Sequence, residues 1–368
     1  MSVAINGTNG ITYNDGTVQA SAAIGKNRII NGDMRIDQRN AGVAATVGSD
    51  YTVDRWKFQE GGSGGQVVSV QQVTDAPVGF SNSFKLTNTT ASSSVTADAY
   101  NMFWQAVEGL NWSDLEWGTS DAKSVTISFW VKASIAGNYS LAVRSSTNDR
   151  SYVTPYAISS ANTWEYKTVT IAGPTSGTFN TDNTKAIQVA FTHSMGSNYT
   201  SSGNDAWQSE SKLGATGTQV ALSNTLNSTW QVTGVQIEAG TSETPFEHLQ
   251  YGQQLALCQR YFYTESQADA YHNLMNGFYA STILWIGVLH LPVPLRASPT
   301  LTVSGSWQTS GASPNSSTAS GFVSQDNVVA NINSVQIRAN VSITNAGQAA
   351  TLRNDNDTSA KFELSSEL

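Results

Sequence analysis

Apolar and polar residues alternate along much of this chain, and the alternation predicts β-strands between residues 26 and 250. The clearest example is SVTISFWVKAS at 124–134. Because successive side chains of a strand point to opposite faces of its sheet, a spacing of two predicts one buried face. The side chains expected on that face are Val125, Ile127, Phe129 and Val131.

Further segments with strand character follow along the chain. In the segment 164–173 we expect Tyr166 to point inward and, after a change of frame, Val169 and Ile171 as well. Turns rich in Gly, Asn and Ser join these segments, which favours an all-β fold and, for residues 26–246, an antiparallel sandwich of the jelly-roll type. Similar patterns occupy 83–88, 139–145, 186–193 and 229–240.

Other parts of the chain follow different patterns. Residues 1–25 predict a hairpin, because an Asp-Gly turn signal separates two short β-prone runs. A lone hairpin is only marginally stable in water, so we expect this segment to serve attachment or oligomerisation. The connection 196–217 is too long for a hairpin turn, and such loops are functional or mobile. Residues 247–263 predict a short connecting helix, and 264–368 predict a smaller β domain.

Composition narrows the possible partners. Charged residues make up 12% of the chain, and 19 Lys and Arg against 27 Asp and Glu give a formal net charge of −8. Phosphate neutralisation needs clustered Lys and Arg, so a nucleic-acid partner is not expected. The most apolar stretch, at 281–295, is shorter than the roughly 20 residues that span a bilayer, so membrane insertion is not expected. A surface of hydroxyls, amides and scattered aromatic rings is typical of proteins that bind neutral glycans.

Glu247, His248 and the only cysteine, Cys258, raise the question of a catalytic nucleophile with its base. A reactive thiolate needs an adjacent His or a helix N-terminus. Cys258 instead falls on the apolar stripe of the expected helix, where a buried Cys behaves as a small hydrophobic residue. We therefore interpret these three residues as packing. The stripe consists of Tyr251, Leu255, Cys258 and Phe262.

Metal ligands are not indicated by the histidine spacing. The four histidines form no HxH or HExxH pattern, so we predict no metal site and no cofactor. Asn204 and Asp205 offer oxygen atoms of the kind that Ca²⁺ prefers, but Asn and Asp are favoured in turns in any case. The histidines are His193, His248, His272 and His290.

Tryptophans beside carboxylates form the main candidate site. Aromatic rings stack on the CH faces of sugars and carboxylates accept hydrogen bonds from their hydroxyls, so this pattern favours glycan contact; paired acids can also mark a glycosidase. The alternative is that the tryptophans fill the core and the acids cap turns. The candidate acids are Asp98, Asp114 and Glu116, and the candidate glycan-binding residues are Trp104, Trp112, Trp117, Tyr199 and Trp207.

Several blocks of sequence resemble bacteriophage tail fibre proteins, and the resemblance covers nearly the whole chain. These blocks include NGTNGITYNDGTVQASAA, NRIINGDMRIDQRNAG, YTVDRWKF and WQVTGVQIEAGTSETPFEHLQYGQQLALCQRYF. Where related sequences usually read GTELALCQRYF, this chain has GQQLALCQRYF. The motifs are structural signatures, and they carry no catalytic residues over to this chain.

The resemblance implies a non-enzymatic virion protein, located in the tail and assembled in the host cytoplasm. It implies a short homotrimeric tail fibre with a carbohydrate-binding-module-like sandwich, docked on other tail or baseplate proteins through residues 1–25. Such a fibre would recognise a host surface glycan during adsorption, and three weak sites would gain by avidity. Two alternatives stay open: a tailspike-like glycan depolymerase, and a purely structural collar or decoration protein.

Overall fold

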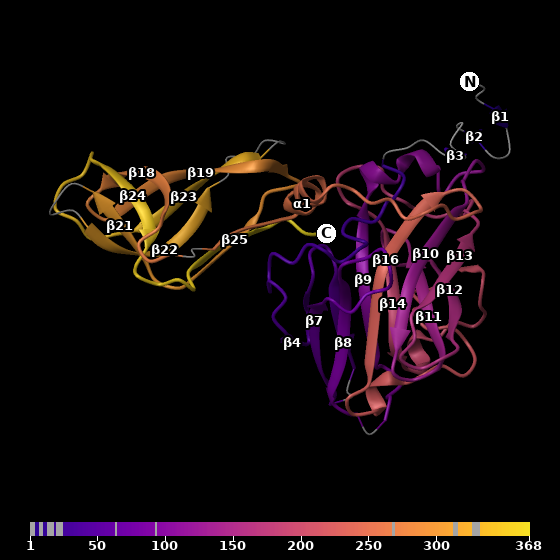
Figure 1. Ribbon diagram of the computed structural model, residues 1–368. Helices are drawn as coiled ribbons and strands as arrows, with labels where there is room; N and C mark the ends of the chain where they lie inside the picture. The colour runs from indigo at the N-terminus through magenta and orange to yellow at the C-terminus, as the bar shows by residue number, and fades with distance from the viewer. Residues whose placement is uncertain are drawn as a thin grey trace. The chain divides into compact units, whose positions relative to one another are not determined.

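A computed structural model describes residues 4–6, 10–12, 18–19, 25–62, 65–92, 94–266, 269–311, 316–325 and 332–368. Within these ranges the regular structure is almost entirely antiparallel β, which confirms the all-β prediction. The chain divides into two compact units, residues 1–251 and 252–368, which are considered separately (Figure 1). No helix in the described ranges is both long and apolar enough to cross a membrane.

Three short strands near the N-terminus form a small sheet of their own: β1 (Ala4–Asn6), β2 (Gly10–Thr12) and β3 (Val18–Gln19). β2 pairs with β3 in antiparallel fashion, as expected for the two arms of the hairpin. β1 adds a third strand that the sequence did not predict. The Asp-Gly turn itself lies outside the described residues.

The rest of the first unit is a sandwich of two antiparallel sheets. Strands that are distant in sequence meet in it: β8 pairs with β16, and the two lie side by side in Figure 1. The six-stranded sheet has the order β13 (Glu165–Ile171), β10 (Val125–Ala133), β16 (Thr229–Ala239), β8 (Ser83–Thr90), β7 (Val67–Val73) and β4 (Ala45–Val47). The seven-stranded sheet has the order β15 (Trp207–Gln208), β12 (Ser151–Ile158), β11 (Gly137–Arg144), β14 (Lys185–Met195), β9 (Tyr100–Glu108), β6 (Lys57–Gly61) and β5 (Ser49–Tyr51).

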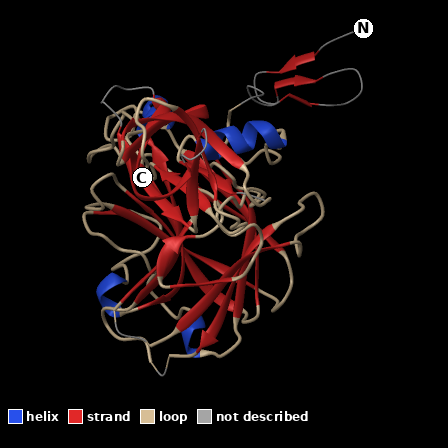
Figure 2. Cartoon of the chain, turned by 90° about the vertical axis from the view of Figure 1, so that its left-hand side faces the viewer, coloured by secondary structure: helices blue, strands red, loops and turns tan. Residues whose placement is uncertain are grey.

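The core lies between these two sheets. All four apolar side chains expected on the buried face of β10 are fully buried there. Phe103 of β9 stacks on Trp56 and on Phe84 of β8, with ring centroids 4.8 and 3.8 Å away. Each such ring contributes about 2–3 kcal/mol through burial of its apolar surface. Short helical turns lie at the margins of the sheets (Figure 2): η1 (Gly109–Asn111), η2 (Ser113–Leu115), η3 (Ser197–Tyr199) and η4 (Leu222–Asn224).

One predicted orientation in the sandwich is wrong. Tyr166 of β13 is 40% exposed, whereas Ile171 is buried and Val169 packs against the core. β13 pairs with β10 in an unbroken register, so no change of frame occurs. Tyr166 lies opposite Trp130 on the outer face of the sheet, with ring centroids 5.3 Å apart, and this contact offsets its exposure.

The long connection at 196–217 packs against the seven-stranded sheet. Its β15 pairs with β12, and Leu213 and Ala215 are buried. The backbone N–H of Ala215 donates to Ser140 Oγ of β11 over 2.9 Å. The connection therefore extends the sheet instead of forming an open binding loop.

Helix α1 (Tyr251–Gln259) begins at the last residue of the first unit and is shorter than the helix expected over 247–263. Its start is delayed because the Glu247 carboxylate accepts hydrogen bonds from the backbone of Gly25 and Asn27, over 2.6 and 2.9 Å, in an extended stretch. The expected apolar stripe is only partly formed. Cys258 is buried, but Tyr251 is 58% exposed and Phe262 already belongs to the next strand.

After α1 the chain forms a three-stranded sheet and a closed barrel. Trp285 and Trp307 fill the barrel core, and their indole N–H groups donate to the backbone carbonyls of Ala350 and Ser304 over 3.2 and 2.9 Å. The sheet has the order β17 (Phe262–Ser266), β25 (Lys361–Ser365) and β20 (Thr300–Ser304). The barrel has the order β18 (Asn273–Ser281), β19 (Leu284–Leu295), β23 (Ile332–Asn340), β22 (Ser316–Gln325), β21 (Trp307–Gly311) and β24 (Ala349–Asn354).

Candidate functional site

A cleft with a volume of about 430 Å³ opens where two loops of the sandwich approach each other. One loop contains η2 and leads into β10, and the other leads from β13 into β14. We call it the aromatic cleft. It is lined by Trp112, Ser113, residues 116–119 and residues 177–181.

Perpendicular aromatic contacts build the wall of this cleft. Trp117 stands at the centre, with its ring 4.8 Å from Trp112, 5.5 Å from Phe179 and 5.3 Å from Trp207. Edge-to-face pairs of this kind add about 0.5–1.5 kcal/mol each beyond the area they bury. Trp112 and Trp117 are buried, and Phe179 and Trp207 are half-buried, so the cluster is rigid and partly open.

The indole N–H groups of the cluster are not equally satisfied. Trp117 Nε1 donates to the carbonyl of Lys123 over 2.7 Å, and Trp207 Nε1 donates to that of Ala172 over 2.9 Å. Trp112 Nε1 is buried and has no partner among the described residues. An unsatisfied buried donor of this kind costs about 1–3 kcal/mol of stability.

Gly118 sets the shape of the cleft floor. Its φ of +92° is a left-handed conformation that side chains disfavour, and a Cβ there would lie 2.5 Å from the carbonyl oxygen of Gly177. Its own N–H donates to the carbonyl of Pro174 over 2.8 Å. The absence of a side chain lets the two loops approach closely enough to form a single cleft.

The candidate acids are engaged with cations or with other segments. Glu116 lies at the cleft and accepts from Lys123 Nζ over 3.2 Å, and Asp114 pairs with Arg28 over 2.6 Å. Asp98 accepts a hydrogen bond from Asn198 and does not line the cleft. Exposed pairs of this type hold loops in place, and each contributes at most about 1 kcal/mol.

The five predicted glycan-binding residues fall into two groups. Trp112, Trp117 and Trp207 form one ring cluster, in which Trp112 and Trp117 line the aromatic cleft and Trp207 contacts Trp117 without lining it. Trp104 of β9 is 8% exposed, and its Nε1 donates to Gln59 Oε1 over 3.1 Å. The ring of Tyr199 packs edge-on against Tyr100, 4.9 Å away. Trp104 and Tyr199 therefore do not line the cleft. The sequence analysis did not single out Phe179, although an aromatic residue in a Gly- and Thr-rich turn is a usable signal.

The Glu247–His248 pair and Cys258 make separate contacts. His248 packs against the rings of Phe80 and Phe246, 5.3 and 5.0 Å away, in the first unit. Cys258 is buried in the second unit. His248 and Cys258 are therefore packing residues, and Glu247 is a hydrogen-bond acceptor for backbone N–H groups.

Within the described ranges there is no group of three or more His, Cys, Asp or Glu side chains that could hold a metal ion. Asn204 instead ties its turn together, because its side chain accepts from the N–H of Thr216 and donates to the carbonyl of Thr216, over 2.9 and 3.1 Å. Asp205, with φ of 60°, continues that turn.

Comparisons with known proteins give distant structural neighbours. No protein-family model matches the chain, and no curated protein matches its sequence. The enzymatically active domain of tailspike protein 4 from bacteriophage CBA120 is similar at 15% identity and a TM-score of 0.32, covering 58% of this chain and 22% of that one. A putative sugar-binding protein from Bacteroides thetaiotaomicron is similar at 12% identity and a TM-score of 0.32, covering 58% and 100%. A family 11 carbohydrate-binding module from Clostridium thermocellum is similar at 17% identity and a TM-score of 0.27, covering 55% and 98%. At these identities and TM-scores, no function is transferred.

Proposed function

We propose that the aromatic cleft binds a glycan and that the protein recognises the surface of a bacterial host as part of a bacteriophage tail. The observation that carries the proposal is the cleft itself, in which aromatic rings and hydroxyl or amide groups line one volume of about 430 Å³. This volume lies in the usual range for small-ligand sites, about 300–1,000 Å³. It suits one or two sugar units.

The chemistry of the lining supports a sugar over an apolar ligand. Phe179 offers a partly open ring on which a sugar face can stack. Asn180 and the neighbouring threonines offer polar groups for ring hydroxyls. A sugar satisfies both kinds of group at once, whereas a hydrocarbon would leave the polar ones unpaired.

The sequence resemblance to tail fibre proteins supports the biological setting. We propose that three copies of the chain assemble, that residues 1–25 contact other tail or baseplate proteins, and that the sites act together during adsorption. A weak single site is then enough for attachment, because once one copy has bound, the effective concentration of glycan at the other two sites is raised. We also propose that the protein binds without cleaving its glycan and needs no cofactor.

A paired substitution tests the site. Phe179→Ala removes a half-buried ring from the cleft, and Tyr166→Ala removes an exposed ring from the outer face of β13 as a matched control. We expect the first variant to lose at least tenfold in binding to a bacterial glycan array and the second to bind as the original chain does. Equal binding by all three proteins would refute the cleft as the site.

Three further measurements test the remaining parts of the proposal. Light scattering should give three times the chain mass, and a stable monomer would contradict the trimer. The bound polysaccharide should keep its length after incubation, since shortening would favour a depolymerase.

Purified protein should block phage adsorption, and a failure to block would favour a purely structural tail protein.

A further inference from the structure

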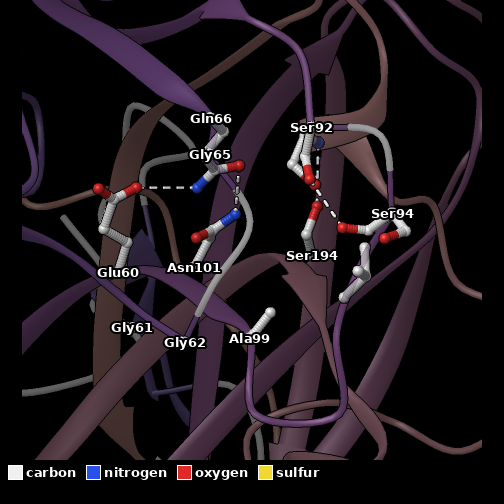
Figure 3. A pocket seen from close by; sticks show the side chains of 12 residues that line it. Glu60, Gly61, Gly62, Gly65, Gln66, Ser92, Ser94, Ala99, Asn101 and Ser194 are labelled. Atoms are coloured by element: carbon white, nitrogen blue, oxygen red, sulfur yellow. Dashed lines mark hydrogen bonds between the residues drawn. The ribbon is translucent and has the colours of Figure 1, made fainter.

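A second, polar cleft lies where β6 ends and β9 begins, and the described residues that line it include no aromatic ring (Figure 3). Its volume is about 50 Å³. We call it the polar cleft. The side chains that define it are Glu60, Gln66, Ser92, Ser94, Asn101 and Ser194.

One wall is a chain of hydrogen bonds that fixes the orientation of each amide. Gln66 Nε2 donates to Glu60 Oε2 over 2.9 Å, and Asn101 Nδ2 donates to Gln66 Oε1 over 2.8 Å. An ionised carboxylate only accepts, so Gln66 must turn its nitrogen to Glu60 and its oxygen to Asn101. Asn101 Oδ1 is thereby left as an acceptor with no hydrogen-bond donor among the described residues.

The opposite wall carries hydroxyl groups. Ser92 Oγ donates to the carbonyl of Ser94 over 2.7 Å, and Ser194 Oγ accepts from the backbone of Ser223 over 3.0 Å. In Figure 3 these serines face the carboxamide wall across the opening. Ser92 and Ser194 are buried, as is Asn101, so the groups are held by the fold.

Unpaired polar groups continue inward from this cleft. A cavity of about 10 Å³ shares Gln66, Asn101 and Ser223 with it and is also lined by His193 and Asn88. Both ring nitrogens of His193 and the Oδ1 of Asn88 are buried, with no partner among the described residues. The surface of this cavity is almost wholly apolar and its volume is at the lower limit for a water molecule, so these groups stay unpaired below the cleft.

We propose that the polar cleft is a second binding site, which takes the hydroxyl-bearing edge of a single sugar or polyol unit. Hydroxyl groups both donate and accept, and the cleft presents amide N–H donors beside carboxylate, carbonyl and hydroxyl acceptors. A metal cation is disfavoured because, among the described lining residues, Glu60 is the only acidic side chain, and its carboxylate already accepts from Gln66. The volume admits a few non-hydrogen atoms and excludes a whole ring. This site does not depend on the aromatic cleft.

Ligand-observed NMR on the full chain carrying Phe179→Ala tests the proposal, because that change removes the sugar-stacking ring of the aromatic cleft and leaves the polar cleft intact. The probes are glycerol, methyl α-D-glucopyranoside and methyl α-D-mannopyranoside, each at about 20 mM, because a site made of hydrogen bonds alone is expected to bind in the millimolar range. Saturation transfer to at least one probe is expected. No transfer to any of them would overturn the proposal.

Three variants assign the signal. Asn101→Ala removes the free acceptor and is expected to lower transfer at least fivefold. Ser94→Phe, at an exposed position, fills the opening without removing a buried group and is expected to abolish transfer. Tyr166→Ala, on the outer face of β13, lines neither cleft and is expected to leave transfer unchanged. Persistence of the signal in Ser94→Phe, or its loss in Tyr166→Ala, would overturn the proposal.

Discussion

The aromatic cleft and the polar cleft belong to the same sandwich, yet they are built on opposite principles. The aromatic cleft, of about 430 Å³, is held by rings that are also part of the core, so its shape and the stability of the fold share the same side chains. The polar cleft, of about 50 Å³, is held by amide and hydroxyl hydrogen bonds, each of which contributes little net stability. Changes in the first should therefore affect folding and binding together, whereas changes in the second should affect mainly binding or pH dependence.

The largest expected effect is that of Trp117→Ala. Trp117 is 6% exposed and contacts three other rings, so its removal leaves a cavity in the core. Loss of a buried Trp costs about 3–5 kcal/mol of unfolding free energy. Urea unfolding would measure this loss. Ser94→Ala at the polar cleft is the control and should change stability by less than about 0.5 kcal/mol, as exposed sites do. Equal losses of unfolding free energy in Trp117→Ala and Ser94→Ala would contradict the view that only the aromatic cleft shares its side chains with the core.

A pair of glycine substitutions compares the two clefts directly. Gly118 and Gly65 both have positive φ, at +92° and +65°, but a Cβ at Gly118 would meet backbone at 2.5 Å while one at Gly65 meets nothing within 4 Å. Both changes to Ala should cost about 1–2 kcal/mol through left-handed strain. Gly118→Ala should cost about 1–3 kcal/mol more through forced movement of the opposite loop. Thermal unfolding of the two variants measures the difference, and similar melting temperatures would contradict the close approach.

His193, beneath the polar cleft, makes stability depend on pH. Burial without hydrogen bonds lowers its pKa to about 3. The folded state therefore holds a neutral imidazole, while the unfolded chain takes up a proton below its ordinary pKa of about 6.5. Stability should be full above pH 6.5 and fall by about 2 kcal/mol between pH 6.5 and pH 5, with further loss towards pH 3. Urea unfolding across this range tests the slope, and His193→Met should flatten it. An unchanged slope in that variant would mean that other groups carry the effect.

The sequence revealed the aromatic cleft more readily than the polar one for a physical reason. Trp112 and Trp117 are five residues apart, so the two tryptophans can be recognised as a local cluster in the sequence. The pairing of β15 with β12 then brings Trp207 to the same place. The polar cleft draws Glu60, Asn101 and Ser194 from three strands, and each residue type is common in this Ser- and Asn-rich chain. Only the register between β6, β9 and β14 brings such residues together.

The fold shows the same division between local and tertiary information. Strict alternation in β10 fixed its buried face, because one face of a strand must meet the core. Tyr166 misled the prediction because a large aromatic residue can also be half-buried by a cross-strand neighbour on the outer face. Helix α1 was predicted too long because the hydrogen bonds of Glu247 to the segment near residue 25 come from 220 residues away in sequence. Contacts of that kind leave no periodic signal.

Glu60→Gln carries the smallest expected effect and separates the roles of charge and shape in the polar cleft. Burial is the main cause that raises the pKa of the Glu60 carboxyl, while the hydrogen bond from Gln66 opposes it. An acid with a raised folded pKa destabilises the fold when it is ionised, so its cost is present above the folded pKa and absent below the ordinary value of about 4.3. Glutamine keeps the acceptor for Gln66 without the charge. We therefore expect a small rise in melting temperature at pH 8 and none at pH 4, measured on the same preparation. A fall at pH 8 would mean that the ionised carboxylate stabilises the amide chain, and the polar cleft would then be organised by charge instead of by neutral hydrogen bonding.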